Sequence, residues 1–193
     1  MRGSAEEGQS VPLLHCRSSL RFTALAGLLA SLTNVAFAGS APERAAMIGF
    51  LFKLPTFVEW PDGVLTSPSD AFRLCIVGED PFGPPLDEAG KGQAVGKHAI
   101  IIQREKTVSP DDHCQMMYID GEPEFVTQSL AAVSGRPVLT VTNAPTGEKG
   151  IVNFVAVQDH VHLEIDEQAA LRNHLNVSSK LLDLAAAPEG GTP

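Results

Sequence analysis

His160, His162 and Glu164 are the residues whose types and spacing come closest to a chemical site. They stand at i, i+2 and i+4, so in a strand all three side chains share one face. Two imidazoles and a carboxylate on one face could ligate zinc. The residues between them are apolar, however, and ordinary alternation of polar and buried positions explains the same pattern. We therefore expect no metal and no other cofactor.

The glycine cluster GKGQAVGKH, residues 90–98, suggests a phosphate-binding loop, but its spacing is wrong. A P-loop has four residues between its glycines, followed by Lys and then Ser or Thr. Here three residues separate Gly92 from Gly96, and His98 follows Lys97. The dinucleotide fingerprint also fails, because the cluster precedes an expected strand and not a helix. We interpret it as a flexible turn.

No group of residues has the pattern of an active site. The chain has no G-x-S-x-G and no H-E-x-x-H motif. His113 precedes Cys114, but a cysteine in a disulfide cannot serve as a thiolate. We predict that the protein is not an enzyme and that it acts through a surface for a ligand or a partner.

The N-terminal residues predict export. Arg17 and Arg21 precede an apolar run that is too short to span a membrane, which takes ~20 residues, and the run ends in the small-residue site Ala36-Phe37-Ala38. We therefore expect residues 1–38 to be a cleaved signal peptide and the protein to be periplasmic. Residues 39–187 would form a single domain, with residues 188–193 as a disordered tail.

The charge of the chain argues against nucleic acid as a partner. The chain has 14 Lys and Arg against 23 Asp and Glu, a net charge of −9 at pH 7. The expected leader carries three Arg and two Glu, so the mature protein remains acidic. Such a surface repels extended phosphate backbones, and the chain has no cluster of basic residues.

Two cysteines, Cys75 and Cys114, remain after Cys16 leaves with the leader. An oxidising compartment favours a bond between them, which would close a loop and stabilise the fold. Two buried, unpaired thiols in neighbouring strands are the alternative.

The spacing of apolar residues predicts helices and strands that alternate along the chain. A helix is expected over Glu43–Glu59, with Pro55 kinking or dividing it. We expect further helices around Pro85–Ala89 and over Glu122–Ser134, Glu167–His174 and Ser179–Ala186. Six strands are expected over residues 71–78, 98–104, 115–120, 137–143, 151–158 and 160–166, the last two as a hairpin turning at Gln158-Asp159.

This order predicts an α/β fold with a mixed, mostly parallel sheet of about six strands. Helices would flank the sheet, and the hairpin near the C-terminus would be antiparallel.

Five segments in register carry a resemblance to a known family. They are FLFKLPTFVEWPDG, FRLCIVGEDPFGPPLDEAGKG, GRPVLTVTNAP, GIVNFVAVQDHVHLEID and LNVSSKLLDLA, and together they extend over nearly the whole mature chain. In order and spacing the chain resembles the YfiR-like family of periplasmic regulatory proteins.

This resemblance implies a function. The best-known members repress an inner-membrane diguanylate cyclase by binding its periplasmic sensory domain, and they are themselves sequestered by an outer-membrane lipoprotein. The chain would thus lower cyclic di-GMP and affect biofilm formation. The partner implied is the periplasmic domain of a diguanylate cyclase or a sensor kinase.

The resemblance also implies that Cys75 and Cys114 occupy the positions of a family disulfide. A second bridge found in some members would lie near NAPTGEKGIVNF, residues 143–154, where this chain has no cysteine.

Phe57 and Trp60 belong to an aromatic stripe that has two interpretations. As core residues they would cover the sheet. As interface residues they would stay partly exposed and dock the partner or a second copy, which would make a homodimer.

An alternative function is that of a periplasmic small-molecule-binding sensor. Its pocket would lie between the fourth strand and the C-terminal segment. The residues expected to line that pocket are Arg136, Asn143, Glu164, Ser178, Ser179 and Lys180.

Overall fold

The computed structural model describes residues 40–186, except for residues 68, 110 and 158–159. The chain divides into two units, Met1–Ala36 and Phe37–Pro193, and the second contains everything described below. The expected signal peptide, the C-terminal tail and the turn at Gln158-Asp159 lie outside the described residues.

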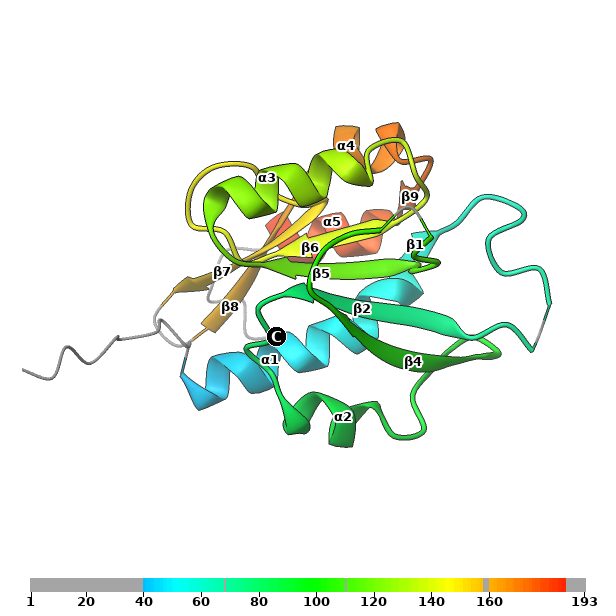
Figure 1. Cartoon of the computed structure of the whole chain (residues 1–193), viewed down its shortest axis with the longest axis horizontal. Helices are drawn as coiled ribbons and strands as arrows, with labels where there is room; N and C mark the ends of the chain where they lie inside the picture. Colours follow the sequence, from blue (N-terminus) through cyan, green and yellow to red (C-terminus); the bar gives the residue numbers. More distant parts are fainter. Residues whose placement is uncertain (1–39, 68, 110, 158–159, 187–193) are drawn as a thin grey trace, which may run out of the picture. The chain divides into compact units, whose positions relative to one another are not determined.

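A curled seven-stranded sheet is the centre of the fold, with the strand order β3-β4-β2-β5-β6-β7-β8 (Figure 1). Its central strands run parallel, whereas β3 pairs antiparallel with β4 and β8 pairs antiparallel with β7. The bounds are β2 Phe72–Gly78, β3 Ala94–Val95, β4 His98–Glu105, β5 Met116–Asp120, β6 Leu139–Thr142, β7 Val152–Val157 and β8 His160–Ile165. The predicted mixed α/β class is confirmed, and the short β3 is an addition to the six expected strands.

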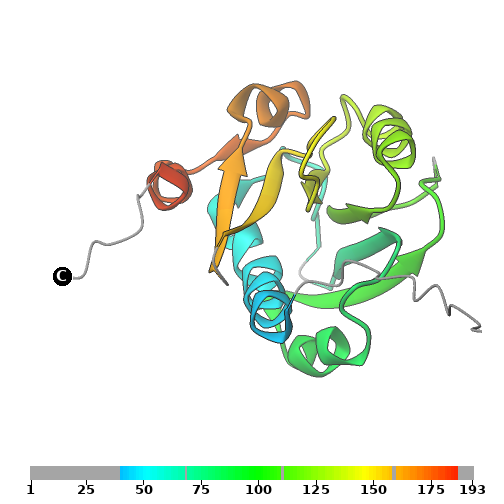
Figure 2. The ribbon, with the colours of Figure 1, turned by 90° about the vertical axis from the view of Figure 1, so that its left-hand side faces the viewer.

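The helices cover both faces of the sheet. Helices α1 and α2 lie on one face and α3 lies on the other (Figures 1 and 2). The bounds are α1 Ala41–Lys53, α2 Pro84–Gly90, α3 Pro123–Ala132, α4 Glu167–Arg172 and α5 Ser179–Ala186.

The alternation in β2 explains why two cores form. Phe72, Leu74 and Ile76 face the larger core under α1, and Cys75 and Val77 face the smaller core under α3. All five are buried, which accounts for the nearly continuous apolar sequence of this strand.

Helix α1 begins two residues before the predicted start, because Ser40 caps it. The Glu43 amide donates to Ser40 Oγ at 3.4 Å, and the Ser40 amide donates to Glu43 Oε2 at 2.7 Å, so the two residues form a reciprocal capping box.

The predicted helix over Glu43–Glu59 is wrong after Lys53. The chain forms a 3-10 helix over Leu54–Phe57, and Val58–Glu59 is strand β1, paired antiparallel with β9, Asn176–Val177. Pro55 has no amide hydrogen for an α-helical turn, and β-branched Val58 suits the pairing with β9. This two-stranded sheet joins the start of the domain to its C-terminal segment, which sequence periodicity could not reveal.

Candidate functional site

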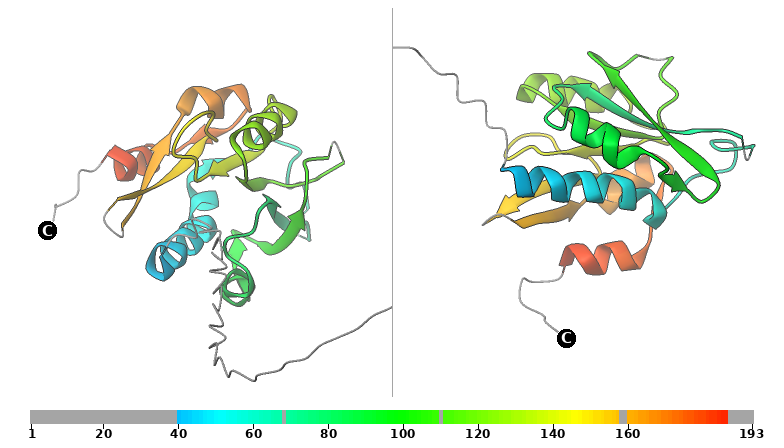
Figure 3. Two further views of the ribbon diagram at one scale, coloured as in Figure 1. Left: turned by 60° about the vertical axis from the view of Figure 1, so that its left-hand side comes forward. Right: turned by 90° about the horizontal axis from the view of Figure 1, so that it is seen from below.

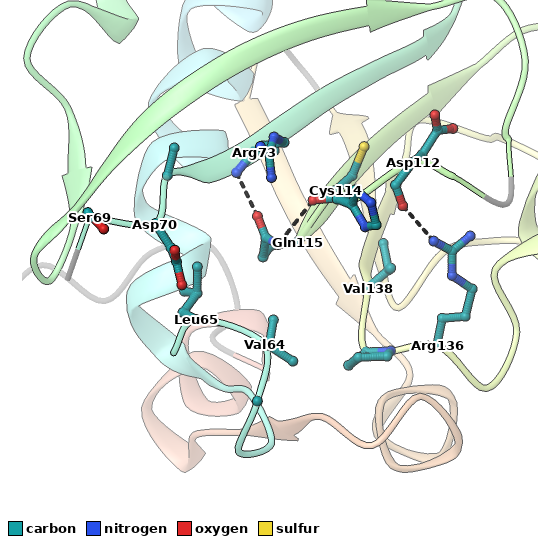
Figure 4. A pocket seen from close by; sticks show the side chains of 14 residues that line it. Val64, Leu65, Ser69, Asp70, Arg73, Asp112, Cys114, Gln115, Arg136 and Val138 are labelled. Carbon is teal, nitrogen blue, oxygen red and sulfur yellow. Dashed lines mark hydrogen bonds between the residues drawn. The ribbon is translucent and has the colours of Figure 1, made fainter. Parts of the chain in front are cut away.

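A cavity of about 530 Å³ opens at the amino ends of β2, β5 and β6 (Figure 4). Its wall comes from the loop before β2, the segment 112–115 before β5 and the segment 136–138 before β6. Its volume lies within the range of small-molecule sites, about 300–1,000 Å³. Side chains from three separate parts of the chain converge here, because parallel strands begin at the same edge of the sheet.

Arg136 lines this cavity, as one of the residues predicted from sequence to bind a ligand. Its Nη2 donates to the Asp112 carbonyl oxygen at 2.6 Å, and its Nη1 donates to the Ser109 carbonyl oxygen at 3.5 Å. These bonds hold the loop before β5 against the start of β6. They leave the guanidinium charge without a carboxylate partner among the described residues.

Arg73 is a residue of this cavity that sequence reasoning missed. Its amide donates to Gln115 Oε1 at 2.7 Å, and Gln115 Nε2 donates to the His113 carbonyl at 3.0 Å. Arg73 is half-buried as a residue, and its guanidinium has no hydrogen bond or ion pair within the described residues. The signal available in the sequence was an arginine in the second position of a strand that is otherwise apolar.

The disulfide between Cys75 and Cys114 lies beside the cavity and joins β2 to the segment just before β5. The two Cα atoms are 6.0 Å apart, and both residues are buried. Of the two possibilities left by the sequence, the paired one is therefore correct. Since Cys114 is the cysteine in the cavity wall, the wall holds no free thiol to act as a nucleophile.

Phe57 and Trp60 are half-buried and pack against the larger core. The Trp60 ring meets Phe72 edge to face, with ring centroids 5.4 Å apart. Trp60 Nε1 is buried and has no hydrogen-bond partner among the described residues. Most of this aromatic surface therefore supports the core.

Asn143 and Glu164 lie away from the cavity. Asn143 follows the last residue of β6, at the opposite end of that strand from Arg136. Glu164 pairs with Lys149 at 2.7 Å and accepts from Asn153 Nδ2 at 3.0 Å. The Lys149 and Asn153 hydrogen bonds hold the pKa of Glu164 below its usual value.

Ser178, Ser179 and Lys180 form a third group at the start of α5. The Ser178 amide donates to the Phe57 carbonyl at 2.9 Å, next to the β1–β9 pair. Ser178 Oγ is buried without a hydrogen-bond partner in the described residues, whereas Ser179 and Lys180 are exposed. The structure thus distributes the six residues of the expected pocket over three places.

The strand His160–Ile165 carries the predicted polar face, with His160 and Glu164 exposed. No group of three or more His, Cys, Asp or Glu side chains that could hold a metal occurs within the described ranges.

Arg104 organises the loop at the carboxyl ends of β2 and β4, a cluster that sequence analysis also missed. Its guanidinium donates to Asp80 at 2.7 Å and binds both carboxylate oxygens of Asp87 at 2.9 Å. Asp80 in turn accepts the amides of Phe82 and Gly83. Burial alone would raise the pKa of Asp80, but the Arg104 bond and these two amides more than offset it and leave the pKa lowered.

We expect Arg104→Gln to lower the free energy of unfolding at pH 7 by about 1–2 kcal/mol, a charge-assisted value reduced for solvent exposure. Because the folded pKa of Asp80 is depressed, its contribution is present above the unfolded pKa of 3.8 and is lost as the pH falls through the folded pKa. The variant should therefore lose less stability than the wild type on acidification. Urea unfolding at pH 7 and at pH 3 measures both effects.

Lys91→Gln is the matched control, since the Lys91–Glu88 pair is 70% exposed on both sides. Its unfolding midpoint should stay unchanged. Equal effects of the two substitutions would contradict the structural role of Arg104.

None of the helices in the described part of the chain combines the length and the apolar character needed to cross a membrane.

A comparison with known protein families identifies a match for this chain. The chain matches the YfiR/HmsC-like family over residues 45–186, a range that begins within α1 and includes every strand and the other four α-helices. A comparison with curated proteins finds no significant match. The family is known for periplasmic regulation of cyclic di-GMP signalling, and its members are regulatory and not catalytic. Because the match extends over more than half of the sequence, the chain belongs to the YfiR/HmsC-like family.

Proposed function

We propose that the protein represses an inner-membrane diguanylate cyclase by binding its periplasmic domain, and so lowers cyclic di-GMP. The observation that carries this proposal is the family match from α1 to α5. The disulfide supports it, because such bonds persist in oxidising compartments such as the periplasm. An outer-membrane lipoprotein that sequesters the repressor, and a homodimer, belong to the same proposal.

The outer side of α5 is the surface that we assign to the partner. This helix lies at the periphery of the domain beside β8 (Figures 2 and 3). Leu181 anchors it to the core, whereas Leu184 is 59% exposed. A large apolar side chain in that position is the type of residue that a partner surface buries.

Cyclic di-GMP levels in a strain that lacks the gene test the repression. Deletion should raise them, and the wild-type gene should restore them. Crosslinking in intact cells followed by purification from membranes should recover a diguanylate cyclase or a sensor kinase. Unchanged cyclic di-GMP after deletion would overturn the proposal.

Leu184→Glu should abolish repression without unfolding the protein. An apolar anchor at the centre of an interface contributes about 2 kcal/mol or more, so its replacement by a charge should weaken binding ~30-fold. The cyclic di-GMP level should then approach that of the deletion strain.

Ile101→Glu is the matched control, because Ile101 is also an exposed apolar residue, at 46%, but lies on β4 at the other side of the sheet. That variant should repress normally. Loss of repression in the Ile101 variant alone would contradict the assignment to α5 and would indicate that the partner binds at β4.

A second candidate function is ligand sensing, which the cavity at the amino ends of β2, β5 and β6 favours. This cavity is a different place from the pocket expected from sequence, and it shares only Arg136 with it.

A further inference from the structure

We propose that the cavity at the amino ends of β2, β5 and β6 binds a small oxyanion, a carboxylate or a phosphate group, through Arg73 and Arg136. This inference rests on the second candidate function, ligand sensing, and is independent of the repression of a cyclase.

Two positively charged side chains at the cavity lack carboxylate partners among the described residues. Arg73 and Arg136 both line it, and neither forms an ion pair with a described residue. Arginine keeps its charge at every pH that the periplasm meets. Elsewhere in the described chain, Arg104 and Lys149 have carboxylate partners within 2.9 Å. Two arginines without such partners at one cavity are therefore unusual in this acidic protein.

The two carboxylates in the wall, Asp70 and Asp112, are engaged with their own loops. Asp70 Oδ2 accepts the amides of Ser67 and Thr66 at 2.8 and 2.9 Å, and these bonds lower the pKa of Asp70. Asp112 Oδ2 accepts the Ser109 amide at 2.6 Å. Both carboxylates thus stabilise the turns that form the rim, and neither carboxylate bonds to an arginine side chain among the described residues, although Arg136 bonds to the main-chain carbonyl of Asp112.

The donors that remain are those of the Arg73 guanidinium, which has no protein acceptor in the described residues. A guanidinium presents paired N–H groups in one plane, which fit the two oxygens of a carboxylate or a phosphate. Because Arg73 is partly buried, the guanidinium is reached by less water than a fully exposed one. A bound oxyanion would supply both the missing acceptors and the missing charge.

The wall is also held in place before any ligand arrives. The disulfide fixes Cys114, the Gln115 side chain bonds to both β2 and His113, and Arg136 holds the Asp112 carbonyl (Figure 4). A site that is already ordered loses less conformational freedom on binding. The overall negative charge disfavours long polyanions, but a small anion meets only this local charge.

Isothermal titration calorimetry of the protein with sodium phosphate and, separately, with sodium succinate tests the inference. We expect saturable binding of at least one anion at a single site, weakened by added sodium chloride. The anion that binds identifies whether the natural ligand carries a phosphate or a carboxylate. Vesicles of phosphatidylglycerol serve as a third titrant, and binding to vesicles without binding to free anions would overturn the inference.

Arg73→Gln should weaken binding at least about tenfold, because it removes a charge-assisted pair of hydrogen bonds. Arg73→Lys keeps the charge but not the planar pair of donors. The affinity of this variant for the anion should therefore lie between that of the wild type and that of Arg73→Gln. Arg44→Gln is the control, since Arg44 lies in the first turn of α1 and does not line the cavity. Thermal melts establish that each variant is folded.

Binding of neither anion, or equal affinity in the wild type and in the Arg73 and Arg44 variants, would overturn the site. The cyclic di-GMP assay measures repression, and the titration measures anion binding. Absence of anion binding would therefore not contradict the proposed repression, and absence of repression would not contradict the anion site.

Discussion

Removal of the Cys75–Cys114 disulfide should lower the free energy of unfolding by about 4 kcal/mol in the chain-entropy model. The bond joins residues 39 positions apart, so its loss frees a long loop in the unfolded chain. Both cysteines are buried, and Cys114 holds the cavity wall. Urea unfolding of the oxidised protein and of the Cys75→Ala/Cys114→Ala double variant measures the difference, because alanine leaves no unpaired polar group in the core.

Reducing agent supplies the control for this comparison. It should lower the unfolding midpoint of the wild type and leave that of the double variant where it is. Equal midpoints for the oxidised wild type and the double variant would show that the bond does not stabilise the fold.

Gly78→Ala should destabilise the protein by about 2–5 kcal/mol, the sum of a left-handed backbone cost and of overpacking. Gly78 ends β2 with φ of +86°, and a Cβ atom there would collide with the Asp120 carbonyl oxygen and would lie 2.5 Å from Phe125 Cε1. The same carbonyl accepts the Glu79 amide, so the collision also disturbs the pairing of β2 with β5. Thermal and urea unfolding measure the loss.

Gly63→Ala separates the two causes. Gly63 also has a positive φ, +97°, but a Cβ atom there meets nothing within 4 Å. This variant should lose only the backbone contribution, about 1–2 kcal/mol. If Gly78→Ala and Gly63→Ala lost the same stability, the overpacking expected from the close approach of Asp120 and Phe125 to Gly78 would be contradicted.

Much of the fold could be predicted because local patterns and global structure agree. The alternation in Phe72–Gly78 indicated a strand buried on both faces, and α5 spans Ser179–Ala186 as predicted. Pro55 indicated where the first helix stops. The continuation to Glu59 as a helix was wrong because β1 pairs with β9, more than a hundred residues away in sequence.

Less of the candidate site could be predicted, since a cavity depends on which residues meet. Arg136 was singled out for its motif, whereas Arg73 looked like an ordinary strand residue. Gln115, which bonds to both Arg73 and His113, gave no sign of that role.

The sequence by itself determined the class of fold, the order of its longer helices and strands, and the family, because these follow from apolar periodicity, from glycine and proline positions and from motifs in register. The tertiary structure decided that the two cysteines bond to each other, that Arg104 on β4 joins the loop after β2 to helix α2, and that Arg73 and Arg136 share one cavity. The physical reason is that parallel strands bring together residues that are far apart in sequence. An arginine without a carboxylate partner can be recognised only when the side chains around it in the folded protein are known.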